Sequence, residues 1–282
     1  MGTEFRYALG RYCGQILGWG LTLAGLGLFL IPFYDVFLEQ KEGMLQLIQG
    51  YPKALMAFFG DFGNFFEPAG FLDTYFSYLP VIWGIFAVLA GSGLVSADEE
   101  NGRLDLVLAY PVGRSALFFG RLAALVLAMA GIMALGWLGF SVTLGTSSLA
   151  VTWGEMALPF VALLAQMLIY GALALFLSML LPSRRTAAWV AGLVMVASYF
   201  LSSLSRINEN LKPVAQLLPH DYYQGGKAVE GLNLAWLLGL LGVSAALALL
   251  AWVLFLRRDI RVSGEGGWRL PAWLSWQPRG WR

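Results

Sequence analysis

Six long apolar stretches, separated by shorter polar segments, dominate this chain. They cover approximately residues 16–38, 74–96, 117–143, 155–181, 187–205 and 234–256. Because a helix rises about 1.5 Å per residue, roughly 20 apolar residues cross the hydrocarbon core of a bilayer. The pattern therefore predicts six transmembrane helices, with the polar turn Pro182-Ser183-Arg184-Arg185 joining the fourth and fifth as a hairpin.

The composition supports the same class. Apolar residues make up 59% of the 282 residues, and charged residues make up only 12%. Soluble domains carry about twice that share of charge, which they need to cover their surface. We therefore predict an all-α integral membrane protein. The net charge of +1 gives no indication of a nucleic-acid partner.

Basic residues indicate the orientation, because they gather on the cytoplasmic side of membrane proteins. With the N-terminus inside, thirteen of the 18 basic residues fall on cytoplasmic segments. The other five fall outside: Lys41, Lys53, Arg206, Lys212 and Lys227. Both termini are then expected in the cytoplasm, as an even number of spans requires.

Two outer segments are longer than simple turns. In residues 39–73, the apolar spacing of 44–48 and 54–59 predicts short amphipathic helices on the outer leaflet. Residues 206–233 are either a segment that dips into the membrane or an exposed loop, and the pattern favours neither.

Groups for catalysis or ion coupling are scarce. The predicted spans carry no charged side chain near their centres, which disfavours an ion-coupled carrier. His220, the only histidine, lies beside Asp221 in an outer segment, where an ordinary loop residue is far commoner than a base or metal ligand. Gly225-Gly226-Lys227 lacks the leading glycine and the following Ser or Thr of a phosphate loop. We therefore expect a chain that is not itself an enzyme and that binds no cofactor or metal.

The most informative segment joins the second and third spans. Ser96 and Glu99 have the spacing of a capping box, and residues 98–100 are acidic at a predicted helix N-terminus, where the helix dipole favours negative charge. Leu104, Val107 and Leu108 would line one face, and Pro111 would end the helix. The residues alone allow two interpretations: a rigid contact for a partner protein, or a loop helix packed on its own bundle.

The order of these residues resembles the coupling segment of type-two ATP-binding-cassette permeases. The matching positions are Glu99, Glu100, Gly102, Leu104, Leu108, Pro111 and Arg114. Phe255-Leu256-Arg257-Arg258-Asp259 is similar to that family's closing signature, and residues 218–223 with 228–231 resemble the stretch before its last span. Asp105 is a mild departure. The resemblance covers residues 1–262, which we take as one six-helix transmembrane domain.

The resemblance implies an exporter subunit that works in pairs. A separate ATPase would bind ATP and Mg²⁺ and contact residues 98–114, with Asp98, Glu99 and Glu100 at its start. The second and fifth spans would line the path of an amphipathic or hydrophobic substrate. The candidate pathway residues are Trp83, Phe86, Tyr199, Phe200 and Ser203. A prokaryotic plasma membrane is the location that the resemblance implies.

Three points stay open at the level of sequence. Gly10, Gly14 and Gly18 recur every four residues, which suits a dimer seam or packing within one subunit. The tail 263–282 interleaves Trp and Arg, as a membrane-surface anchor or a second ATPase contact would. A membrane subunit that transmits force or scaffolds an outer partner, without conducting a substrate, would share these features. An intramembrane enzyme is disfavoured by the scarcity of catalytic groups.

Overall fold

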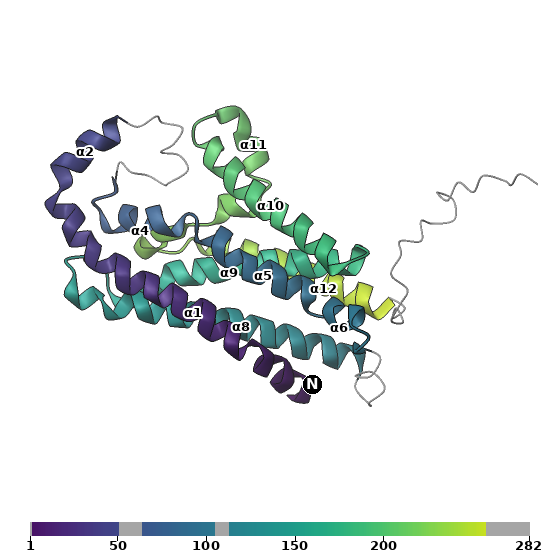
Figure 1. The fold of residues 1–282 in the computed structure, drawn as a ribbon. Helices are drawn as coiled ribbons and strands as arrows, with labels where there is room; N and C mark the ends of the chain where they lie inside the picture. The colour runs from purple at the N-terminus through teal and green to yellow at the C-terminus, as the bar shows by residue number, and fades with distance from the viewer. Residues whose placement is uncertain (1, 51–63, 105–112, 258–282) are drawn as a thin grey trace, which may run out of the picture.

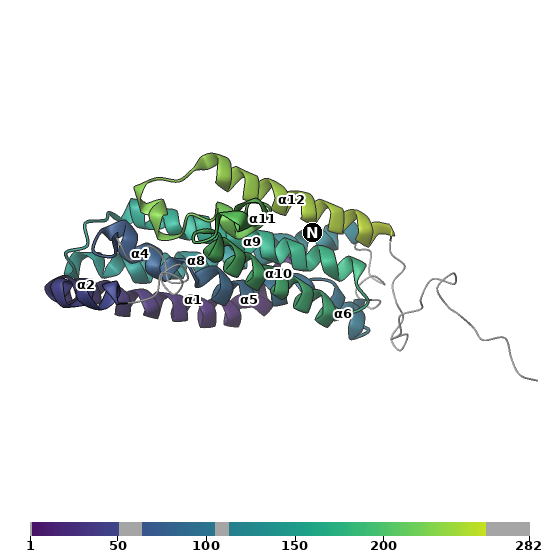
Figure 2. The ribbon, with the colours of Figure 1, turned by 90° about the horizontal axis from the view of Figure 1, so that it is seen from above.

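The computed structural model describes residues 2–50, 64–104 and 113–257. Throughout these residues the regular structure is helical. Long helices run alongside one another and form an elongated bundle (Figure 1). The helix α2 lies at one end of it, and α6 lies with the N-terminus at the other. Seen from above, α1 and α12 lie on opposite sides of the bundle (Figure 2).

Among the described residues, five helices are long and apolar enough to span a membrane. They are α1 (Gly2–Glu39), α8 (Arg114–Val142), α9 (Trp153–Leu180), α10 (Arg184–Ser205) and α12 (Leu234–Arg257). Each contains or closely matches one predicted span. The predicted hairpin is confirmed, since α9 ends just before residues 181–183 and Ser183 caps α10 by accepting a hydrogen bond from the Thr186 N–H at 3.1 Å.

The second predicted span differs from the expected straight helix. It consists of α4 (Pro68–Phe76) and α5 (Leu79–Gly93), which meet at an angle of 41° and together count as a sixth candidate span. Pro80 explains the break, because proline has no N–H to donate and its ring clashes with the carbonyl one turn earlier. The Ser77 hydroxyl donates to the Asp73 carbonyl at 2.6 Å and closes the last turn of α4.

Aromatic side chains fix α4 inside the bundle. Phe76 of α4, Phe140 of α8 and Phe160 of α9 make three mutual edge contacts with centroid distances of 5.2–5.5 Å. Most of α4 is buried, including Asp73. By contrast α12 turns leucines outward, with Leu238 65% exposed, as a lipid-facing helix would.

Glycines let α1 approach α8 closely. A Cβ on Gly139 would lie 2.3 Å from the Ala24 Cα, and one on Gly27 would lie 2.2 Å from the Phe140 ring. Gly10, Gly14 and Gly18 behave differently, because a Cβ on any of them would meet no described atom within 4 Å. Their repeat therefore does not serve packing within the described part of this subunit.

The two long segments between spans contain short helices. The expected amphipathic helix near 44–48 is confirmed as α2 (Lys41–Gln49), and the one expected at 54–59 lies outside the described residues. Residues 206–233 form the turns η3 (Glu209–Leu211), α11 (Lys212–Ala215), η4 (Pro219–Tyr222) and η5 (Gly225–Glu230). In this segment Leu217 is 83% exposed, while η5 packs against α4 and α9.

Candidate functional site

The predicted contact segment begins with α6 (Ser96–Glu100), at the end of the bundle that holds the N-terminus. Its helical turns stop at Gly102, which has φ of 64°. The Gly102 N–H donates to the Glu99 carbonyl at 3.1 Å, and the Arg103 N–H donates to the Asp98 carbonyl at 2.8 Å. This is a Schellman ending, in which a left-handed residue satisfies the last carbonyls of a helix. It explains why glycine occupies position 102, because a side chain there would strain the backbone.

The start of α6 corrects the sequence prediction. Ser96 is not the N-cap, and no side chain caps the helix, whose N-cap is Val95. The Ser96 hydroxyl instead donates to the Ser178 carbonyl of α9 at 3.4 Å. A tertiary contact has taken the group that the local pattern assigned to capping. The single helix predicted from the Ser96 capping box to Pro111 is also wrong, because Gly102 ends the described helix.

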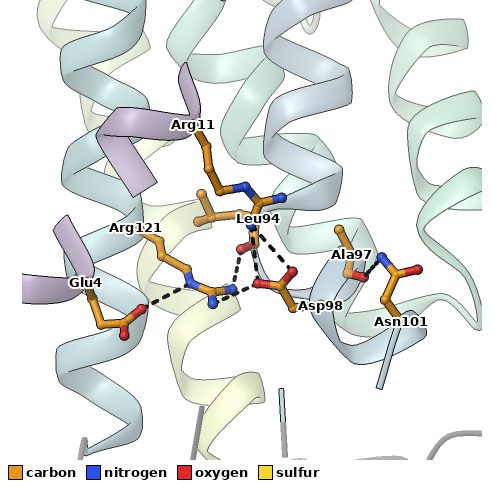
Figure 3. A network of polar contacts seen from close by, with 7 residues as sticks. All are labelled: Glu4, Arg11, Leu94, Ala97, Asp98, Asn101 and Arg121. Carbon is orange, nitrogen blue, oxygen red and sulfur yellow. Dashed lines mark hydrogen bonds and ion pairs between the residues drawn. The ribbon is translucent and has the colours of Figure 1, made fainter. Parts of the chain in front are cut away.

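Asp98 of α6 is the centre of a buried ion cluster that joins three helices (Figure 3). Its carboxylate lies 2.8 Å from Arg121 Nη2 of α8 and 3.4 Å from Arg11 Nη1 of α1. The first contact is an ion pair whose N–H is not aligned as a hydrogen bond. Arg121 also donates to the Leu94 carbonyl at 3.1 Å and lies 3.7 Å from Glu4 of α1. The cluster therefore ties α6 to both α1 and α8.

The central ion pair of this cluster is buried, which distinguishes it from a salt bridge on the protein surface. The side chains of Arg121 and Asp98 are only 4% and 5% exposed, whereas that of Arg11 is 51% exposed. Two charges taken out of water are tolerated only when each has a partner, and removal of either leaves the other uncompensated. Arg121 and Asp98 thus require each other in place.

Glu100 makes a second connection from α6. Its Oε1 accepts a hydrogen bond from the Arg184 N–H at 2.7 Å, at the first residue of α10. A carboxylate at a helix N-terminus interacts favourably with the unpaired N–H groups and with the helix dipole. Through Glu100, α6 is also fixed to the turn between α9 and α10.

The other predicted contact residues point in different directions. Glu99 and Leu104 are buried in the chain's own bundle, Leu104 at 1% exposure, which fits the second interpretation of this segment for these two side chains. Arg114 donates to the Leu256 carbonyl of α12 at 3.4 Å. Leu108 and Pro111 lie outside the described residues. Among the described residues of the segment, Glu100, Asn101, Arg103 and Gly113 are exposed.

Sequence reasoning missed the partners of Asp98. Arg121 lies inside the apolar stretch 117–143. A charged side chain within such a stretch needs a partner, and that was the available signal. Nothing in the sequence indicated which acidic residue this would be.

The candidate pathway residues fall into two groups. Trp83 and Phe86 are buried on the side of α5 that faces α1, and Trp83 Nε1 donates to the Trp19 carbonyl at 3.2 Å. Tyr199, Phe200 and Ser203 lie on α10, where Ser203 is buried and Phe200 is 47% exposed. The described structure does not bring the two groups together.

An apolar groove lies between α5 and α10. It has a volume of about 600 Å³ and is lined by residues that include Ile85, Leu89, Trp189 and Met195. Trp189 is 74% exposed. Glu100 and Arg184 lie at one end of the groove, so it starts beside the α6 connection.

His220 is buried rather than exposed as an ordinary loop residue would be. Its ring packs between Tyr199 and Tyr223, and burial, assisted by the nearby positive charge of Arg206, lowers the pKa of His220 to about 3. The imidazole is therefore neutral at physiological pH. Within residues 2–50, 64–104 and 113–257, no cluster of three His, Cys, Asp or Glu side chains could hold a metal ion.

Comparison with known proteins gives one family. The profile of the family described as the multidrug efflux system permease Rv1217c, C-terminal domain, matches residues 7–256. Curated proteins gave no significant match. The matched range begins within α1, ends in the last turn of α12 and includes Arg11, Asp98 and Arg121. The chain therefore belongs to the family of the C-terminal domain of the multidrug efflux system permease Rv1217c.

Proposed function

We propose that this chain is the transmembrane permease subunit of an ATP-binding-cassette exporter. A separate ATPase subunit, which binds the ATP and Mg²⁺, contacts residues 98–114 and drives hydrophobic or amphipathic substrates outward. The permease works with a second permease subunit, either another copy or a homologue, in a prokaryotic plasma membrane. The chain itself binds no cofactor and catalyses no reaction.

One observation carries this proposal: the connection of α6 to the rest of the bundle. A push on the contact segment can move transmembrane helices only if the segment is rigidly attached to them. The Asp98 cluster attaches α6 to α1 and α8, and Glu100 attaches it to α10. Such connected elements are what a mechanical coupling between ATPase and spans requires.

The arrangement of helix ends supports the proposed orientation. Contacts between Arg11 and Asp98, between Glu100 and Arg184, and between Arg114 and Leu256 gather these ends at one side of the bundle. Most of the basic residues expected in the cytoplasm belong to this side. A cytoplasmic ATPase would therefore meet α6 and the start of α10 together.

The groove between α5 and α10 is the route that we assign to the substrate. Its apolar lining suits hydrophobic molecules. Because Glu100 and Arg184 lie at one end of the groove, a movement of α6 would change the shape of that end. Phe200 extends the exposed apolar face of α10, with Tyr199 against its ring and Ser203 one turn further. Trp83 and Phe86 hold the back of α5 on α1.

A second candidate function uses the same coupling without transport. In it the subunit would transmit force to an outer partner, and the short helices of residues 206–233 would offer that partner a surface. Reconstituted vesicles separate the two functions. Stimulation of ATP hydrolysis by hydrophobic drugs, together with their transfer across the vesicle membrane, would support the exporter.

Arg103→Glu is expected to reduce the amount of ATPase recovered with the permease by about tenfold or more, because arginines at the centre of an interface often contribute 2 kcal/mol or more. Arg103 is exposed next to the Schellman turn and makes no ion pair with a described residue, so its replacement should leave the fold intact. The measurement is co-purification in mild detergent, with quantitation of the bound ATPase.

Lys212→Glu is the matched control. It makes the same change of charge at an exposed position of α11, where Lys212 has only a surface pair with Glu209. Equal ATPase recovery with both variants would contradict the assignment of the contact to this segment. Leu104→Asp is unsuitable for this test, because Leu104 is buried and its replacement would disturb the bundle itself.

A further inference from the structure

A polar pocket of about 290 Å³ lies far from the α6 connection. It is lined by residues at the ends of α4 and α10, in the turns η4 and η5, and in the first turn of α12. The helix α10 runs from Arg184 beside Glu100 to Ser205, so its 22 residues separate the two sites by about 33 Å. The pocket is therefore no part of the ATPase contact.

Two residues that line this pocket each carry a buried polar atom with no hydrogen-bond partner among the described residues. These atoms are Nδ1 of His220, a residue 5% exposed, and the hydroxyl of Ser202, a residue 4% exposed. Leaving such a group unpaired costs about 1–3 kcal/mol, and native proteins rarely do so without a bound water or ligand. The position of His220 is not accidental, because its backbone N–H donates to the Ser198 hydroxyl at 3.0 Å and two tyrosine rings hold the imidazole.

Opposite charges also line this pocket without pairing. Arg206 and Asp221 both line it, and neither forms an ion pair with a described residue. Partial burial raises the pKa of Asp221, and the attraction of Arg206 only opposes this rise. The other two charged groups, Asp73 and Lys227, already lie 3.9 Å apart as a pair. The unmatched charges are thus one cation and one anion.

The position along the helices indicates the depth of the pocket. It lies where the apolar helix α10 ends and α12 begins, which is the boundary between hydrocarbon and water for two candidate spans. Trp236 in the first turn of α12 lines the pocket, and Tyr222 packs against its ring at 6.0 Å. Tryptophan and tyrosine are typical of that boundary, at the level of lipid headgroups.

We propose that this pocket binds a zwitterionic group in which a primary ammonium stands beside a phosphate, as in a phosphoethanolamine headgroup. Arg206 receives the phosphate, which matches guanidinium geometry. Asp221 receives the ammonium, whose N–H groups donate to the carboxylate. A quaternary ammonium would have no N–H to give, so a choline headgroup fits less well.

Native mass spectrometry of the full chain in detergent tests this binding without the ATPase, so its result is independent of the proposed exporter function. The probes are phosphatidylethanolamine, phosphatidylcholine and phosphatidylglycerol with identical acyl chains. We expect retention of phosphatidylethanolamine to exceed that of the other two by about tenfold. Equal retention of the three lipids would overturn the proposal.

Variants locate the binding. Arg206→Gln and Asp221→Asn should each remove the preference for phosphatidylethanolamine, while Lys212→Gln, an exposed cation outside the pocket, should keep it. A preference that survives both pocket variants would place the lipid elsewhere and overturn the proposal. The elution profile of each variant shows whether it remains folded.

Soluble phosphoethanolamine distinguishes the sources and does not depend on variants. If it displaces phosphatidylethanolamine from the wild-type chain, while equimolar phosphate plus ethanolamine does not, the headgroup alone is recognised. If only the lipid binds with the expected preference, the acyl chains contribute and the occupant is a membrane lipid. If neither probe binds selectively, water alone fills the pocket and the proposal fails.

Discussion

Asp98→Ala is expected to lower the free energy of unfolding by about 3–5 kcal/mol, because it leaves the buried guanidinium of Arg121 without its principal partner. Glu4 remains 3.7 Å from Arg121 and cannot replace the contact of 2.8 Å that is lost. The change also frees α6 from α1 and α8. Thermal or denaturant unfolding of the purified chain in detergent measures the first effect, and drug efflux from cells measures the second.

Arg11→Gln is the control within the same cluster. Arg11 contacts the same carboxylate at 3.4 Å, but its side chain is half exposed, so its loss should cost less than about 1 kcal/mol. If Asp98→Ala and Arg11→Gln lower stability by the same small amount, the Arg121 charge is solvated and the cluster is not the connection that we propose. Asp98→Asn, which keeps the shape, should fall between the two.

Gly139→Ala is expected to destabilise the chain by about 3 kcal/mol, at the upper end of what overpacking usually costs. The added methyl would lie 2.3 Å from the Ala24 Cα and 2.4 Å from the Ala24 carbonyl oxygen. Backbone atoms cannot turn away as a side chain can, so α1 and α8 must separate. Unfolding in detergent, followed by helical circular dichroism, measures the loss.

Gly14→Ala makes the same chemical change on α1, at a position with no described atom within 4 Å of the new methyl. It should leave monomer stability within about 1 kcal/mol or raise it, because alanine favours helix. Equal destabilisation by the two variants would contradict the close approach of α1 and α8 at Gly139. Loss of a dimer by Gly14→Ala, with unchanged monomer stability, would locate a subunit seam there.

The sequence allowed the residues of the contact segment to be predicted, but not the partners of Asp98. The acidic run 98–100, Gly102 and Leu104 stand out in the chain, and the resemblance gave them a role. The sequence did not indicate which of these side chains are exposed, because the direction of each side chain depends on the helices packed around it. Asp98 pairs with Arg11 across 87 residues of sequence, and Leu104 turns into the core.

The pocket around His220 was not anticipated at all. The sequence indicated a lone histidine in a loop, which is commonly exposed. His220 is buried because η4 packs against α10, α12 and α9. Another wall of the pocket is α4, a helix that the apolar pattern did not separate from the second span. The break before Pro80 was encoded locally, but a proline signals only that a helix is interrupted, not where the preceding turn will lie.

The sequence by itself determined the class of the protein, the places of the long apolar helices and the short turn between α9 and α10. These features depend on local quantities: apolar length, capping residues and helix-breaking residues. Only the tertiary structure decided where α4 lies, the ion partners of Asp98, the exposed position of Arg103 and the pocket at His220. The physical reason is that a buried charge or polar group is stabilised by whichever partner the packing brings within reach, and packing joins residues that are far apart in the chain.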